Sequence, residues 1–201
     1  MSITAQDVKK LRDATGVGMM DAQKALQEAQ GNLEIAIENL RKSSAKIAAK
    51  KLDREAHEGL VVSYIHAGGK VGVLVEVNCE TDFVARTEDF ASFCRDIALH
   101  IAAAAPEFLA KEDVPQDVIA KEREIYIGQM AADPTNEKKP EDVKEKILQG
   151  KIDKFLAEKC LLSQSFIKDP TKTVQQLMQE TVAKVGENIR IKRFSRFALA
   201  G

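Results

Sequence analysis

Few residues in this sequence stand at spacings that would support chemistry, although two glycine-rich segments could be taken for nucleotide-binding loops. The segment Gly16-Val17-Gly18-Met19-Met20-Asp21 begins like a dinucleotide fingerprint, but it lacks the third glycine and follows a predicted helix instead of a strand. The segment Gly68-Gly69-Lys70-Val71-Gly72 lacks the GxxxxGK(S/T) spacing and lies in a predicted hairpin. Neither segment is therefore predicted to bind a nucleotide.

The residue types that ligate metals or act as nucleophiles are scattered. None of the histidines and cysteines stands at a metal-ligand or CxxC spacing: His57, His66, His100, Cys79, Cys94 and Cys160. Pattern alone indicates that His66 is a surface strand residue and not a base. No Ser/His/Asp arrangement or pair of carboxylates can be argued either. We expect no resident metal and no cofactor, and the protein is predicted not to be an enzyme.

Two clusters remain as candidate binding surfaces, and the first is residues 79–86, Cys-Glu-Thr-Asp-Phe-Val-Ala-Arg, between a predicted strand and a predicted helix. Thr81 or Asp82 can cap that helix, and Phe83 would then begin its buried apolar stripe. Alternatively, Phe83 projects as an exposed apolar side chain beside a charge, which is typical of an interface hot spot. The pattern alone favours the buried interpretation.

The second cluster is residues 190–197, Arg-Ile-Lys-Arg-Phe-Ser-Arg-Phe. Four basic residues with interleaved aromatics could form an RNA-binding strand, together with the basic segment around residues 41–54. The other interpretation is a strand with one solvated basic face. The chain has 30 Lys+Arg against 31 Asp+Glu, and this balance favours the second interpretation.

The N-terminal elements follow from helical periodicity and capping residues. Residues 1–44 predict three short helices, with a capping box at Thr4 and an N-cap at Asn32. Three such helices bury little surface, so a partner is expected to share in stabilising them. Residues 45–58 predict an exposed helical linker.

From residue 59 the period changes from 3.6 to 2, which predicts a β-hairpin over residues 60–79 and, after another helix, a strand at the C-terminus. The predicted class is α+β: a three-stranded antiparallel sheet with helices, built from residues 59–115 and 160–201. Residues 116–159 predict a protruding antiparallel helical hairpin. A helix is predicted to follow Pro170 and to end at Gly186.

Composition bears on where the protein works. The longest apolar runs fall far short of a membrane span, and the first residues resemble neither an export nor a transit signal. Three widely spaced cysteines fit a reducing compartment better than a disulfide framework. We expect a cytoplasmic protein that contacts no membrane.

Two motifs connect the chain to a known family. Residues 15–21, Thr-Gly-Val-Gly-Met-Met-Asp, resemble the first signature of the elongation factor Ts family, TGxGMMD. Residues 76–86 resemble its second, EVNCxTDFVA. The likeness continues through residues 36–42, 100–103 and 185–189, and so it spans nearly the whole chain.

The resemblance implies a guanine nucleotide exchange factor that binds elongation factor Tu in its GDP-bound and nucleotide-free states, without direct nucleic-acid contact. It implies that the UBA-like three-helix module docks on the partner's GTPase domain. The family element that wedges against the nucleotide domain and dislodges Mg²⁺ is matched by Thr81, Asp82, Phe83 and Val84. Further contact positions of the family are matched by Met19, Met20, His66, Val185 and Gly186.

The sequence differs from longer members of that family, which carry two related copies of the core subdomain and a further helical module. One core copy is found here, and a second chain could supply the other. We therefore expect a homodimer with a two-fold, isologous interface.

Overall fold

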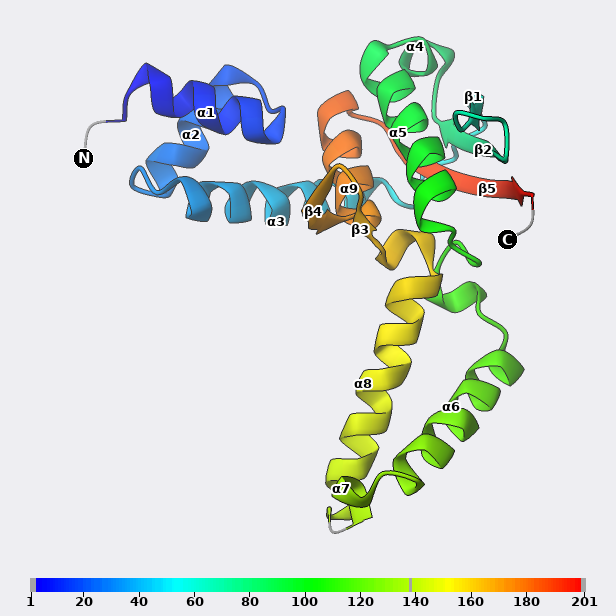
Figure 1. Cartoon of the computed structure of the whole chain (residues 1–201). Helices are drawn as coiled ribbons and strands as arrows, with labels where there is room; N and C mark the ends of the chain where they lie inside the picture. The colour runs from blue at the N-terminus through cyan, green and yellow to red at the C-terminus, as the bar shows by residue number, and fades with distance from the viewer. Residues whose placement is uncertain (1–2, 138, 200–201) are drawn as a thin grey trace. The chain divides into compact units, whose positions relative to one another are not determined.

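The computed structural model of the protein describes residues 3–137 and 139–199 (Figure 1). It combines helices with a three-stranded antiparallel sheet, which confirms the predicted α+β class. The backbone forms two compact units: residues 3–64, 74–98 and 176–195, and residues 65–73, 99–137, 139–175 and 196–199. Parts of the predicted module, hairpin and core lie outside the described residues: 1–2, 138 and 200–201.

The first unit begins with α1 (Ala5–Thr15), α2 (Met19–Glu28) and α3 (Leu33–Lys51). The predicted capping box is present, because the Asp7 N–H donates to Thr4 Oγ1 at 3.2 Å and the Thr4 N–H donates to Asp7 Oδ2 at 3.1 Å. The Thr4 hydroxyl also donates to Asp7 Oδ2 at 2.6 Å, and this bond, together with the one from the Thr4 N–H, lowers the pKa of the Asp7 carboxyl. The predicted N-cap of the third helix is present as well, since Asn32 Oδ1 accepts from the Ile35 N–H at 3.1 Å.

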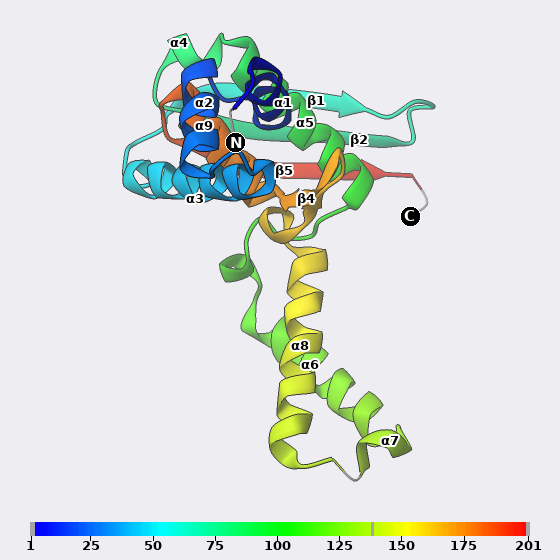
Figure 2. The ribbon, with the colours of Figure 1, turned by 90° about the vertical axis from the view of Figure 1, so that its left-hand side faces the viewer.

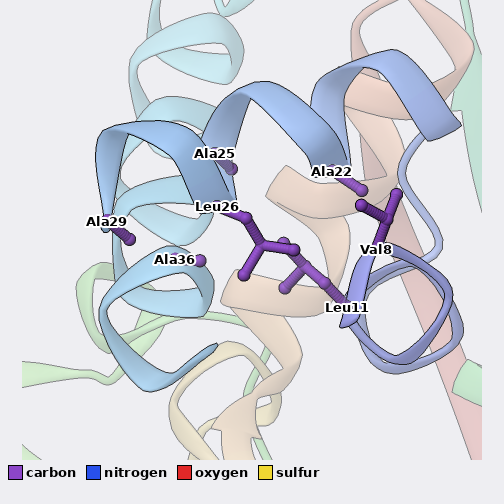
Figure 3. Packing of buried hydrophobic residues seen from close by; sticks show 7 residues of the cluster. All are labelled: Val8, Leu11, Ala22, Ala25, Leu26, Ala29 and Ala36. Carbon is purple, nitrogen blue, oxygen red and sulfur yellow. The ribbon is translucent and has the colours of Figure 1, made fainter. Parts of the chain in front are cut away.

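The three helices enclose a small core of their own. Figure 3 shows side chains from α1 and α2 pointing toward one another, with a single alanine from α3 beside them. Most of the buried members are alanines, whose small side chains let the helices approach closely. The cluster consists of Val8, Leu11, Ala22, Ala25, Leu26, Ala29 and Ala36.

One predicted boundary does not coincide with an end of structure. The third helix and the linker helix were expected to separate near residue 44, but α3 continues without interruption to Lys51. Residues 43–51 are rich in alanine and lysine, which favour helix, so nothing in that stretch ends it. Residues 45–51 of the predicted linker therefore form the last part of α3, whereas residues 52–57 are not helical, so the helical linker expected over residues 45–58 is only partly helical.

The sheet consists of β1 (Glu58–Ile65), β2 (Val71–Cys79) and β5 (Ile189–Ala198) in the order β1-β2-β5 (Figure 2). The predicted hairpin is present, and its turn is closed by the His66 N–H, which donates to the Val71 carbonyl at 2.9 Å. Alternate residues of β2 are buried: Val73, Val75, Val77 and Cys79. Gly59 lies so close to β2 that an added Cβ would be 2.1 Å from the Val77 carbonyl oxygen, so this strand pairing requires a glycine.

After the sheet's first hairpin come α4 (Asp82–Ala85) and α5 (Glu88–Ala104). Later in the chain, α9 (Val174–Val185) leads into β5. Before α9, β3 (Ser165–Phe166) and β4 (Asp169–Thr173) form a small antiparallel pair that the sequence pattern did not indicate. β4 contains aspartate and proline, which are depleted in strands, so local propensity gave no signal for it.

The second unit contains the predicted helical hairpin, formed by α6 (Gln116–Ala131), α7 (Pro134–Glu137) and α8 (Glu141–Lys159) (Figures 1 and 2). The guanidinium of Arg123 on α6 donates to both carboxylate oxygens of Glu145 on α8 at 2.9 Å. Single 3₁₀ turns, Lys111–Asp113 and Leu161–Ser163, precede α6 and follow α8.

A buried polar cluster lies in the same unit, around His100. His100 Nδ1 accepts from the Ile167 N–H at 3.3 Å, so the neutral ring carries its proton on Nε2 and donates it to Gln164 Oε1 at 2.9 Å. The Gln164 amide in turn donates to the Glu158 carbonyl at 2.6 Å. Burial lowers the pKa of His100, although the bond to Gln164 opposes that effect.

Candidate protein-binding site

The first candidate cluster forms a short turn between β2 and α5. We refer to residues 80–86 as the α4 turn. Its helix, α4, is capped by Thr81, whose Oγ1 accepts from the Val84 N–H at 3.4 Å. The Phe83 side chain is 78% exposed, so it does not begin the core stripe. That stripe begins at the fully buried Phe90, because α4 ends at Ala85 and the helix restarts only at Glu88.

Asp82 stands beside Phe83 and has a charged partner within the turn. Its Oδ2 atom lies 2.8 Å from the Arg86 guanidinium, with the two side chains 45% and 77% exposed. Such an exposed pair contributes little to stability. The α4 turn therefore presents an aromatic ring and an accessible carboxylate side by side.

The α4 turn is held from the segment between α9 and β5. The Glu187 carboxylate accepts from the Thr81 N–H at 3.0 Å and from the Thr81 hydroxyl at 2.7 Å. Gly186 precedes it with φ of +81°, a conformation that glycine adopts at little cost after the end of a helix. The structure thus bonds Thr81 to Glu187, which directly follows the predicted contact positions Val185 and Gly186 in the chain.

Asn188 holds the other side of the same turn. Its N–H donates to Glu80 Oε1 at 2.6 Å, and its side-chain amide donates to the carbonyls of Leu52 and Arg54 at 3.3 and 2.7 Å. The Asn188 residue is only 2% exposed. It therefore connects the α4 turn with the chain that leaves α3.

Cys79, directly before the α4 turn, is a buried residue that contributes a hydrogen bond to the turn. Its thiol donates to the Thr81 carbonyl at 3.1 Å. Burial, reinforced by the nearby Glu187 carboxylate, raises the pKa of Cys79 to about 11. Because the thiolate is the reactive form, this cysteine is a poor nucleophile at neutral pH.

The remaining predicted positions lie on other elements. Met19 and Met20 form the start of α2 and are exposed, Met20 to 81%. His66 is exposed at the start of the hairpin turn, in the second unit. The sequence did not predict a role for Glu187 or Asn188, whose partners lie more than a hundred residues away in the chain. The local indications near them were the helix end at Gly186 and the family likeness over residues 185–189.

Several arginines of the basic strand β5 bond to acceptor groups of the protein itself. Arg193 Nε lies 2.7 Å from the Glu76 carboxylate, and the Arg190 guanidinium donates to the Leu52 carbonyl. In the second unit, Arg196 Nε donates to the Ala102 carbonyl at 3.2 Å. These contacts favour the interpretation of a solvated basic face over that of an RNA-binding strand.

Neither a metal centre nor a membrane segment is found in the part of the chain that the structure describes. Within residues 3–137 and 139–199, no three His, Cys, Asp or Glu side chains gather closely enough to hold a metal ion. No helix among these residues is both long and apolar enough to cross a bilayer.

An exposed phenylalanine on a turn held by hydrogen bonds, and exposed methionines at the start of α2, are features typical of proteins that bind another macromolecule. Comparison with known proteins places it further. The family described as "Elongation factor TS" matches the chain over residues 3–200. The chain belongs to the elongation factor Ts family and is a translation elongation factor with a role in nucleotide exchange.

Individual relatives agree along nearly the full chain. Elongation factor Ts of Carboxydothermus hydrogenoformans is 57% identical over 197 residues, which cover 98% of this chain and 89% of the relative. The protein of the same name from Geobacter sulfurreducens is 54% identical over 199 residues, covering 99% and 90%. That of Thermoanaerobacter pseudethanolicus is 56% identical over 195 residues, covering 97% and 94%.

Proposed function

We propose that this protein is the guanine nucleotide exchange factor of elongation factor Tu, acting in the cytoplasm without a cofactor and without breaking a covalent bond. It binds Tu in the GDP-bound and nucleotide-free states and accelerates the release of GDP. The observation that carries this proposal is the exposed Phe83 beside the accessible Asp82 carboxylate, on a turn fixed by Thr81.

The physical role of the α4 turn is to disturb Mg²⁺ in the partner. In a GTPase this ion bridges the nucleotide phosphates to the protein, so displacing it removes a large local charge interaction. Thr81, Asp82, Phe83 and Val84 form the element that we assign to this task. Binding of the exchange factor and binding of GDP then weaken each other by the same factor, as linkage requires.

Further contacts supply affinity for the partner. We assign the residue 1–44 module to docking on the GTPase domain through Met19 and Met20, since exposed methionines adapt well to a partner surface. His66, Val185 and Gly186 are assigned to additional contacts of the core. The division into this module, the core and the 116–159 hairpin is part of the proposal.

We also propose that the protein is a homodimer. In the second unit, the hairpin end of the sheet leaves three large apolar side chains exposed: Ile65, Phe197 and Leu199. Exposed apolar groups of this kind are typical of an interaction surface. A two-fold pairing of copies would cover them and supply the second core subdomain. Light scattering at micromolar concentration is expected to give the mass of two chains.

The deciding experiment is release of labelled GDP from elongation factor Tu with and without this protein. We expect a rate that rises with its concentration and saturates. An unchanged rate at a large excess would contradict the proposal. A salt titration of binding tests the alternative of an RNA-binding protein. Nucleic-acid affinity falls steeply with ionic strength, whereas the affinity of a partly apolar protein interface changes less.

A further inference from the structure

We propose that Glu187 is a positioning residue for nucleotide exchange: acting through Thr81, it fixes the orientation of the short helix that presents Asp82 and Phe83. The inference rests on the proposed function of the α4 turn. Glu187 itself touches no part of that exposed pair in the hydrogen-bond network described above. Its effect is transmitted through the cap of α4.

The α4 turn has little means of holding itself in place. α4 is four residues long, and a helix of that length is not stable on its own. Of its residues only Ala85 is buried, and Phe83 is 78% exposed, so burial of the ring contributes little to holding the turn. The direction of the ring therefore depends on the hydrogen bonds at the start of the helix.

Glu187 organises those bonds with both carboxylate oxygens. Oε2 accepts from the Thr81 N–H at 3.0 Å, and Oε1 accepts from the Thr81 hydroxyl at 2.7 Å. A threonine hydroxyl has one proton, so donating it to Glu187 leaves the Oγ1 lone pairs free for the Val84 N–H at 3.4 Å. The carboxylate thus sets the hydroxyl in the orientation that caps α4.

The position of Glu187 is in turn determined by the elements on each side. Gly186, with φ of +81°, turns the chain away from α9, and the Lys51 ammonium donates to its carbonyl. Asn188 is buried and bonded to three other residues. Because its two neighbours are fixed, the Glu187 side chain reaches Thr81 from a rigid base, as a supporting residue of a functional site must.

The test compares Glu187→Ala with Glu76→Ala, a control that removes the carboxylate paired with Arg193 on the sheet, away from the α4 turn. GDP release from elongation factor Tu is measured over a range of exchange-factor concentrations. We expect Glu187→Ala to lower the saturating rate about tenfold, since bonds to a charged group are lost at the cap, while the half-saturating concentration changes by less than about twofold. Glu76→Ala is expected to stay within about twofold of wild type in both.

A conservative variant and a double variant separate positioning from general damage. Glu187→Gln keeps one acceptor and is expected to recover the saturating rate to within about threefold of wild type. Combining Glu187→Ala with Thr81→Val is expected to slow exchange by less than the product of the two single effects, because both changes remove the bond between the Thr81 hydroxyl and the Glu187 carboxylate. Additive losses would show that Glu187 does not act through Thr81.

The outcome distinguishes this inference from the function on which it rests. If Phe83→Ala slows exchange and Glu187→Ala does not, the positioning role is overturned and the proposed function stands. If Phe83→Ala has no effect either, both are overturned. Where Glu187→Ala does not fold, Glu187→Asp decides: the shorter side chain cannot reach both Thr81 donors from the same backbone position, so the saturating rate is expected to fall about fivefold. A wild-type rate in this variant would overturn the role.

Discussion

Each unit of the molecule contains a network of polar side chains beside a phenylalanine, and the two networks treat that ring in opposite ways. In the first unit, Glu187 and Thr81 hold a turn whose Phe83 is 78% exposed. In the second, His100 and Gln164 are buried, and Phe166 beside them is 4% exposed, with its ring centroid 6.0 Å from that of His100.

The difference shows how a polar network can serve either stability or function. Around Phe166 the hydrogen bonds satisfy buried groups, and the ring adds apolar burial, so the whole arrangement stabilises one fold. Around Phe83 the hydrogen bonds hold a ring that gains nothing for stability by its position. An apolar side chain kept in water by an ordered network is therefore the feature that indicates a partner.

The largest expected effect is on Phe166. Replacing this ring with alanine creates a cavity in a packed core, and we expect Phe166→Ala to lower the free energy of unfolding by about 3–5 kcal/mol. Urea melts measure the loss. Exchange activity per folded molecule should stay near wild type. Lower activity in fully folded Phe166→Ala would show that this ring also contributes to function and not to stability alone.

Phe83→Ala is expected to show the reverse pattern. Stability should remain within about 0.5 kcal/mol of wild type, because the ring is already in water. GDP release should slow by the equivalent of about 2 kcal/mol or more, as for the loss of a hot-spot side chain. A strongly destabilised variant with normal exchange per folded molecule would falsify the assignment of this ring to the partner.

Asn188→Ala tests whether the network of the first unit is uniform. Asn188 is buried, and its removal leaves the Leu52 and Arg54 carbonyls without its amide donors. We expect a loss of about 1–3 kcal/mol in the free energy of unfolding, measured by thermal or urea melts. Glu187 is half-buried, so Glu187→Ala should lower the free energy of unfolding less than Asn188→Ala does, but it should slow GDP release more. Equal stability losses at both positions would remove the distinction between them.

Much of this arrangement is visible in the sequence, and the rest depends on contacts across long stretches of chain. The caps at Thr4 and Asn32 are local signals, and the helices begin where they predict. The exposure of Phe83 is not local, because it depends on α4 and α5 being separate helices. The pairing of Thr81 with Glu187 joins segments 106 residues apart, and no local pattern encodes it.

Asp82→Ala is expected to have a smaller effect than the loss of either phenylalanine. The cap of α4 is Thr81, so the alanine variant loses only the exposed pair with Arg86, and stability should stay within about 0.5 kcal/mol. We expect exchange to slow by the equivalent of about 1 kcal/mol, since a carboxylate facing the partner is lost. Arg86→Ala is the matched control, because it breaks the same ion pair and leaves the Asp82 carboxylate in place. If both variants slowed exchange equally, the ion pair and not the carboxylate itself would be responsible.

The smallest expected effect is a pH dependence of stability that belongs to the second network alone. His100 has a pKa in the folded protein below its ordinary value of 6.5, chiefly because it is buried. As the pH falls below about 6.5, the unfolded chain binds the proton before the folded protein does. The free energy of unfolding that this residue contributes therefore decreases between about pH 6.5 and the lower pKa of the folded state. Protonation also fills Nδ1, which then cannot accept from the Ile167 N–H.

Urea unfolding of the wild type at about pH 7.5, 6.5 and 5.5 measures this loss, with His100→Gln as the reference that cannot titrate. Asp169 in the same unit does not interfere, because its pKa lies below an ordinary value of 3.8 and its contribution changes only at lower pH. The difference between the two proteins should shrink as the pH falls through this range. Exchange by the folded protein should not follow the same curve, since the α4 turn has no histidine within it. If exchange by the fully folded protein fell over the same pH range, protonation of His100 would be affecting the α4 turn. That result would contradict the view that the two networks act independently.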